Sequence, residues 1–107
     1  MSDDFLVVLT TAASAEEGGR IATALVDESL AACVNIVAGC RSVYRWKGKT
    51  LNDDEALLIV KTSRQKFDEV ERRILELHSY DVPEILAIPA VKIAAGYLRF
   101  LQENLDG

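Results

Sequence analysis

The sequence has few residues of the kinds that cross-link a chain or bind metal tightly: its 107 residues include two cysteines and one histidine. Cys33 and Cys40 lie in a strand-like segment, where an extended backbone separates them by roughly 23 Å, beyond the reach of a disulfide bond. They do not form a C-x-x-C clip either. Because a structural zinc site needs three or four converging His or Cys ligands, such a site is excluded within one chain.

An excess of positive charge is also absent. The formal net charge is −5, whereas duplex-binding surfaces usually show a basic balance, so nucleic acid is disfavoured as a partner. Plain solubility explains the acidic surface more simply than attraction of cations does. No apolar run approaches the 18 or so residues that span a bilayer, and the acidic start lacks the basic residues of a signal peptide. We therefore expect a cytoplasmic protein without a membrane partner.

Motifs of enzyme active sites are missing as well. A serine or cysteine nucleophile needs a base within hydrogen-bond reach, and the single histidine, His78, would have to serve every candidate. Neither a P-loop nor a G-x-G-x-x-G motif occurs, and Gly18-Gly19 is too short to cradle a phosphate. The sequence predicts a protein that is not an enzyme.

The residues that are present predict one domain over 1–107, since half of them are hydrophobic and domains are typically about 100–150 residues long. The apolar run Phe5–Thr11 reads as a strand. Ser14 and Glu17 form a capping box that opens a helix to about residue 29. Gly18 and Gly19 would each cost that helix about 1 kcal/mol relative to alanine, which suggests a close neighbour.

A long hairpin follows. Residues 33–46 are β-branched and aromatic, with Gly39 indicating a bend or bulge. Lys47-Gly48-Lys49 predicts a turn, and residues 51–63 return as the third strand. These strands exceed the usual five or six residues, so the tip should project. Exposed arms commonly pair with another subunit, because an unpaired sheet edge is a liability.

The remaining elements complete the pattern. A helix is expected over about 64–78, with i,i+4 charge pairs such as Glu69–Arg73 on its solvated side. A strand over 84–91, marked by Pro89 as an edge, bulge or end, precedes a final helix over 94–105. The order strand–helix–strand–strand–helix–strand plus a tail helix predicts an α+β, ferredoxin-like sandwich.

The segment Leu77–Ile85 (LHSYDVPEI) holds the only histidine. On spacing alone, His78 is best explained as the last turn of a helix, where the helix dipole favours a protonated imidazole. The competing hypothesis is a metal site at a subunit interface, with His78, Glu84 and Glu55 as ligands and water or a neighbouring chain completing the coordination.

Polar and aromatic side chains recur at strand ends. Lys61 ends an apolar strand, so its ammonium either reaches solvent or meets an anion. Tyr44 and Trp46 alternate on one strand face, which favours a subunit contact or core packing over a ligand site.

Five segments in this order resemble the CutA family of divalent-cation tolerance proteins. They are LAACVNI (30–36), SVYRWKG (42–48), EALLIVKT (55–62), HSYDVPEI (78–85) and YLRFL (97–101). The resemblance covers essentially the whole chain. It implies a cytoplasmic ferredoxin-like subunit in a tight homotrimer knitted together by the long hairpin, with a link to tolerance of copper and other divalent metals.

The resemblance also identifies residues to examine. A cysteine of some metal-binding members aligns with Thr10, so the soft ligand that copper prefers is absent here. The family is similar in architecture to the PII signalling proteins, which implies an alternative: a module for a small anionic ligand in a cleft between subunits. The residues carried over for such a cleft are Trp46, Lys61, Tyr80, Pro83 and Tyr97.

Overall fold

The computed structural model describes residues 4–105, so the acidic start at residues 1–3 lies outside the described part. The elements, in chain order, are β1 (Phe5–Ala12), α1 (Ala15–Asp27), β2 (Cys33–Trp46), β3 (Lys49–Ser63), α2 (Phe67–Leu77), β4 (Leu86–Pro89) and α3 (Ala95–Leu105). The predicted order of strands and helices is confirmed, and the fold is α+β with four strands and three helices in the described residues. No helix of this part is long and apolar enough to cross a membrane.

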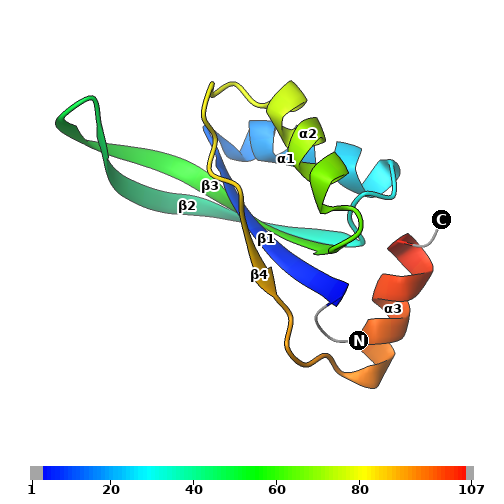
Figure 1. The fold of residues 1–107 in the computed structure, drawn as a ribbon. Helices are drawn as coiled ribbons and strands as arrows, with labels where there is room; N and C mark the ends of the chain where they lie inside the picture. Colours follow the sequence, from blue (N-terminus) through cyan, green and yellow to red (C-terminus); the bar gives the residue numbers. More distant parts are fainter. Residues whose placement is uncertain (1–3, 106–107) are drawn as a thin grey trace.

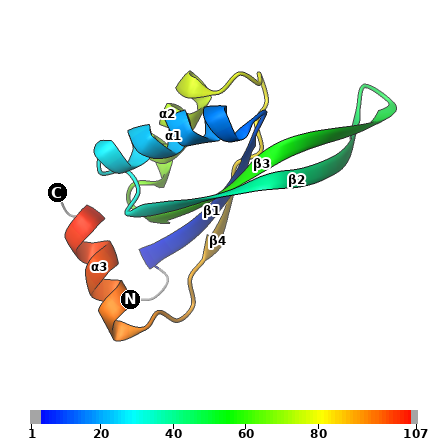
Figure 2. The ribbon, with the colours of Figure 1, turned by 180° about the vertical axis from the view of Figure 1, so that it is seen from behind.

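The four strands form one sheet in the order β2-β3-β1-β4, and every neighbouring pair is antiparallel. Helices α1 and α2 lie side by side on one face of the sheet, while α3 packs near the start of β1 (Figures 1 and 2). The other face is not covered by α1 or α2. We call the two sides the helix face and the open face.

The main core lies between the helix face and helices α1 and α2. Side chains alternate along a strand, and in β3 Leu58 and Val60 are fully buried beneath the helices together with Val8 of β1. From the helices, Ile21 and Ile74 fill the same cluster. The apolar sides of these strands and helices therefore pack together in one buried layer, and this layer provides most of the hydrophobic stabilisation.

Helix α1 begins where the capping box predicts. The Ser14 hydroxyl accepts a hydrogen bond from the Glu17 N–H at 3.1 Å, which satisfies one of the unpaired donors of the first turn. Gly18 faces the sheet, where a Cβ would lie 3.0 Å from Leu58 Cδ2. The expectation of a close neighbour is thus confirmed for Gly18. Gly19 has nothing within 4 Å of its Cβ position, and its presence has no packing explanation.

The β2–β3 hairpin projects beyond the rest of the molecule (Figure 1), whose longest dimension is 44 Å. Its strands have 14 and 15 residues. The turn at Lys47 and Gly48 has positive φ angles of 52° and 80°, which match the right-handed twist of the flanking strands. The predicted irregularity is also confirmed, because the register shifts between Val37 and Cys40, around Gly39 with φ 74°.

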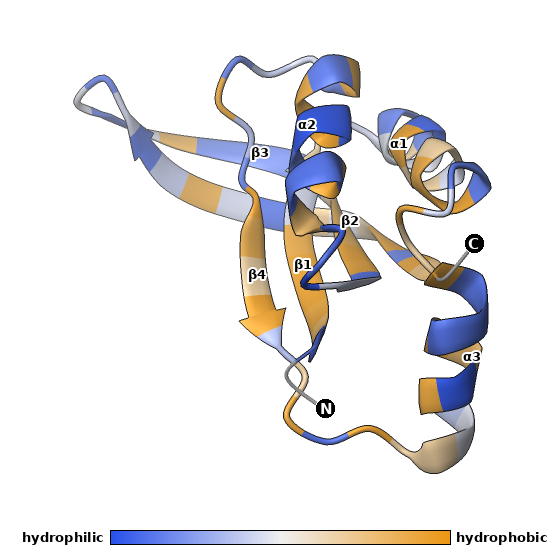
Figure 3. Ribbon diagram, turned by 45° about the vertical axis from the view of Figure 1, so that its right-hand side comes forward, coloured by the Kyte–Doolittle hydropathy of each residue, from blue (hydrophilic) through white to orange (hydrophobic). Residues whose placement is uncertain are grey.

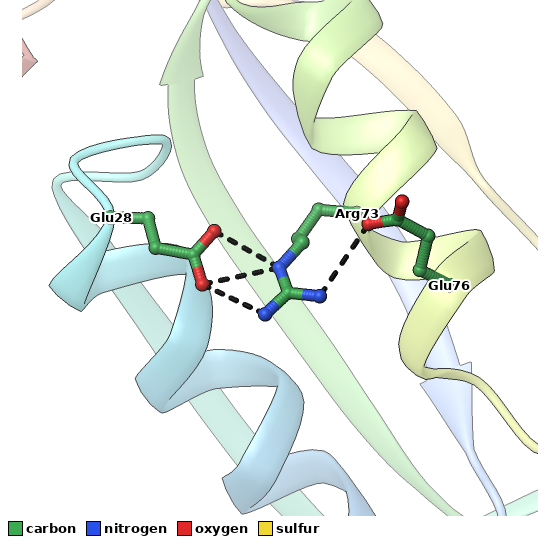
Figure 4. Close-up of polar contacts among 3 residues, drawn as sticks. All are labelled: Glu28, Arg73 and Glu76. Atoms are coloured by element: carbon green, nitrogen blue, oxygen red, sulfur yellow. Dashed lines mark hydrogen bonds and ion pairs between the residues drawn. The ribbon is translucent and has the colours of Figure 1, made fainter.

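Helix α2 starts later than expected, at Phe67 rather than at about residue 64. Residues 64–66 instead form a turn in which the Lys66 N–H donates to Ser63. The prediction of an ion pair between Glu69 and Arg73 is also wrong, because Arg73 pairs with other residues. Figure 4 shows the Arg73 guanidinium between Glu28 of the α1 C-cap and Glu76, with N–O distances of 2.9 Å and 3.5 Å. This ion pair ties α2 to the end of α1.

The open face is apolar. Its exposed or half-buried apolar side chains come from all four strands and include Val7, Leu9, Val37, Leu57, Ile59, Leu86 and Ile88. Figure 3 shows the hydrophobic colouring of β1 and β4. Helix α3 covers one end, where Leu101 and Leu105 pack with Phe5 and Ala32. Much of this face remains accessible in one chain.

Candidate functional site

A pocket of about 640 Å³ lies between the β2–β3 hairpin and the segment that joins α2 to β4. Its lining combines aromatic rings with carboxylates. The residues are Thr11, Ser42, Val43, Tyr44, Trp46, Glu55, Tyr80, Asp81, Val82, Pro83 and Glu84. Cys40 pairs with Glu55 across the hairpin. Since side chains alternate along a strand, the pairing directs Tyr44 and Trp46 to the face that carries Glu55.

Glu55 and Tyr80 form the inner wall of the pocket. The Tyr80 hydroxyl donates to Glu55 Oε2 at 2.7 Å, and the Glu55 side chain is only 8% exposed. Burial raises the pKa of Tyr80 well above its usual value, and the bond to Glu55 raises it further. The tyrosine therefore stays neutral at physiological pH and acts as a hydrogen-bond donor to a carboxylate.

His78 holds the wall in position. It is the C-cap of α2 rather than part of its last turn. Its Nδ1 accepts the Tyr80 N–H at 3.1 Å, so this nitrogen carries no proton. Its Nε2 lies 2.7 Å from the Thr11 carbonyl oxygen and must donate to it. The imidazole thus connects the end of β1 to the pocket segment.

The Glu17 carboxylate makes a second connection between the end of β1 and the segment that follows α2. One carboxylate oxygen accepts the Ala13 N–H at 2.9 Å and the other accepts the Ser79 N–H at 2.8 Å. Burial alone would raise the pKa of Glu17. The hydrogen bonds from Ala13 and Ser79, with His78 nearby, outweigh that effect and hold the pKa below its ordinary value. The ionised carboxylate therefore fixes the segment that follows α2.

The outer part of the pocket is aromatic. The Tyr44 hydroxyl donates to Asp53 Oδ2 at 2.5 Å, and this hydrogen bond raises the pKa of Tyr44. Tyr44 and Trp46 remain about 40% and 47% exposed, so their rings are accessible to a ligand.

Lys61 and Tyr97 lie elsewhere. The Lys61 ammonium donates to the Asn35 side-chain oxygen and lies 4.0 Å from Cys33 Sγ. Burial raises the pKa of the Tyr97 hydroxyl, and the adjacent Cys33 raises it further. Neither Lys61 nor Tyr97 lines the pocket.

The structure therefore brings together five of the predicted site residues at the pocket: Trp46, Glu55, Tyr80, Pro83 and Glu84. His78 supports this group from behind, while Lys61 and Tyr97 form a separate cluster with Cys33. Sequence reasoning missed the roles of Thr11 and Glu17, which anchor the pocket segment. The strand alternation that unites Tyr44 with Trp46 was a usable signal for the aromatic wall.

The fit of a metal ion is limited within one chain. In the described residues, no group of three or more His, Cys, Asp or Glu side chains could hold a metal ion. Glu55 and Glu84 offer oxygen ligands to one pocket, but both His78 nitrogens are engaged. The Thr10 hydroxyl is fully buried without a hydrogen-bond partner. The assignment of His78, Glu84 and Glu55 as metal ligands stays a prediction.

Comparison with known proteins decides the family. Residues 6–104 match the family model described as CutA1 divalent ion tolerance protein. The chain belongs to the CutA1 family. The CutA resemblance read from the five sequence segments is thereby confirmed.

Individual CutA proteins are similar over most of this chain. The divalent-cation tolerance protein CutA of Thermus thermophilus is 50% identical over 98 residues, which cover 92% of this chain and 95% of the relative. The chloroplastic protein CutA of Arabidopsis thaliana is 41% identical over 92% of this chain. The match spans only 54% of that longer plant protein.

The solved structure of the Thermus thermophilus divalent cation tolerance protein superposes with a TM-score of 0.91 at 49% identity. The superposition covers 94% of this chain and 97% of that chain. The α+β fold described above is therefore the fold of solved CutA proteins.

Proposed function

We propose that this chain is the subunit of a non-enzymatic, cytoplasmic homotrimer that contributes to divalent-cation tolerance and binds a divalent metal of the copper class weakly. Membership of the CutA1 family supports the link to divalent cations. The observation that carries the proposal of self-association is the apolar open face, which neither α1 nor α2 covers.

The sheet has the properties of a subunit surface. The strand order β2-β3-β1-β4 with helices on one face supports the ferredoxin-like assignment. It leaves β2 and β4 as edge strands, and β2 is 14 residues long. Long edges and large exposed apolar patches are typical of surfaces that pair with another chain. A second copy would cover both features at once.

The assembly is tested by light scattering on purified protein. We expect a mass of about three times the 11.8 kDa chain. Ile88→Asp should shift the protein toward the monomer, because Ile88 lies on the open face and is 49% exposed in one chain. Val26→Asp is the matched control, since Val26 is 42% exposed on α1. A monomeric wild type would contradict the proposal.

The proposal of metal binding rests mainly on two carboxylates of the pocket. Glu55 and Glu84 supply oxygen ligands at the pocket, and water or a neighbouring subunit would complete the coordination. His78 could join them only by giving up its bond to Thr11 or to Tyr80. A bound divalent cation would supply positive charge that compensates these side chains.

Calorimetric titration with copper and zinc tests this proposal. We expect weak heats for the wild type that decrease in both Glu84→Gln and His78→Ala. Asp54→Asn is the control, because Asp54 is exposed on the same strand and pairs with Arg41 away from the pocket. Negligible heats for the wild type would refute metal binding, and loss in Glu84→Gln alone would remove His78 from the ligand set.

A small-ligand module of the PII type is a second candidate, favoured by the pocket itself. An anionic ligand would need the Lys61–Tyr97 cluster of an adjoining subunit, since no lysine, arginine or histidine among residues 4–105 of the same chain lines the pocket. A thermal-shift panel of nucleotides and metabolites tests it, because a specific ligand raises the melting temperature with concentration. The absence of any hit would count against this candidate.

A further inference from the structure

The pocket is lined by carboxylates, and the described part of the chain places no lysine, arginine or histidine among them. The Glu55 carboxylate is 8% exposed and accepts a hydrogen bond from Tyr80. Among residues 4–105, no lysine, arginine or histidine forms an ion pair with it. Since buried charges in proteins are normally paired, Glu55 is suited to meet a positive charge from outside the chain.

Three aromatic rings also line the same pocket. Tyr44 and Trp46 come from β2, and Tyr80 comes from the segment after α2. The hydroxyls of both tyrosines donate to carboxylates, Tyr44 to Asp53 and Tyr80 to Glu55, which fixes the ring positions. The face of an aromatic ring attracts a cation, and a group of such rings is a recurring site for organic ammonium ions.

We infer that the pocket is a binding site for a small organic ammonium ion, held between the rings of Tyr44, Trp46 and Tyr80 and the carboxylates of Glu55 and Glu84. The volume of about 640 Å³ is within the range of small-molecule sites. An anion is disfavoured by three lining carboxylates without a lysine or arginine. The aromatic rings suit a diffuse organic cation, and such a cation can meet the carboxylates without the close oxygen ligation that a divalent metal requires.

This inference rests on the proposed small-ligand module and reverses the sign of the expected ligand. It does not depend on metal binding, so the titrations are done in the presence of a chelator. Trp46 is the only tryptophan of the chain, and its fluorescence therefore reports directly from the pocket.

The experiment compares three probes of nearly equal shape and different charge. Choline is the cation, 3,3-dimethylbutan-1-ol is its neutral carbon analogue, and 3,3-dimethylbutanoate is the corresponding anion. We expect choline to change the Trp46 fluorescence with saturation, and the neutral and anionic probes to bind at least tenfold more weakly.

Matched variants locate the site. Glu55→Gln removes the buried charge and should weaken choline binding at least fivefold. Glu84→Gln should weaken it about twofold or more, and because Glu84 is exposed, this variant keeps the test valid if Glu55→Gln fails to fold. Asp54→Asn removes a charge from the neighbouring position outside the pocket and should leave choline binding unchanged.

Each outcome is decisive. Saturable binding of choline that is lost in the two glutamine variants supports the inference. Binding of the anion in preference to choline would overturn it and leave the small-ligand module standing. Equal binding of the neutral probe, no saturable change with any probe, or equal loss in Asp54→Asn would each overturn it as well.

Discussion

The two faces of strand β3 differ in how completely their side chains are buried within one chain. On the helix face, Ala56, Leu58 and Val60 are buried to within 1% of complete burial. On the open face, Glu55 of the same strand lines the pocket, and Leu57 and Ile59 are only half-buried. One face therefore completes the fold within the chain, while the other lines a pocket and stays accessible in one chain.

The largest expected loss of stability comes from shortening a buried side chain on the helix face. Leu58→Ala should lower the free energy of unfolding by about 2–5 kcal/mol, because it leaves a cavity in a rigid core. Leu57→Ala is the matched change on the open face, where Leu57 is half-buried in one chain. Its effect should be smaller and should depend on protein concentration. Urea denaturation at two protein concentrations measures both variants, and equal, concentration-independent losses would erase the contrast between the faces.

A smaller effect is expected from Glu17, which links the two faces by fixing the pocket segment. Glu17→Gln places an amide donor against one of two backbone N–H groups, so it should cost about 1–3 kcal/mol. Glu16→Gln, an exposed neighbour in the same turn, is the control.

The same residue gives a pH dependence. The folded-state pKa of Glu17 lies below its ordinary value of 4.5, so its stabilising contribution is present above pH 4.5 and is lost as pH falls through the folded-state pKa. Between pH 7 and pH 3, the wild type should therefore lose more stability than Glu17→Gln. Equal losses in denaturation curves at the two pH values would contradict this account.

The smallest effect is expected at the surface of the helix layer. The Arg73–Glu28 pair is partly exposed, with side chains 32% and 42% accessible, and such pairs contribute about 0–1 kcal/mol. A double-mutant cycle with Arg73→Ala and Glu28→Gln should give a coupling of this size that decreases in 1 M salt. A coupling that salt does not change would mean that the contact is made by packing rather than by charge.

The fold could be predicted because its signals are local. The Ser14–Glu17 box marks the start of α1, and the Lys47-Gly48 turn sets the hairpin register. The start of α2 was harder to predict, because the turn at residues 64–66 depends on a hydrogen bond between Lys66 and Ser63 rather than on apolar periodicity.

The site was only partly predictable. Trp46 and Lys61 both stand at strand ends, and the sequence grouped them in one cleft. In the hairpin Trp46 pairs with Lys49, and Lys61 lies far along β3 from that point, roughly 40 Å at about 3.3 Å per residue. Antiparallel pairing therefore places Trp46 and Lys61 at opposite ends of the β2–β3 hairpin. The bonds of His78 to Thr11 and of Ser79 to Glu17 could not be read from the sequence, because each joins positions more than 60 residues apart.

The sheet order has a consequence for biosynthesis. Strand β1 is made before its partners β3 and β4, and even its last residue, Ala12, pairs with Ala56. At about 5–20 residues per second, the apolar strand Phe5–Ala12 must wait several seconds on the ribosome without a partner. The hairpin β2–β3 can close while it is still emerging, so it provides the template onto which the earlier strand β1 finally docks.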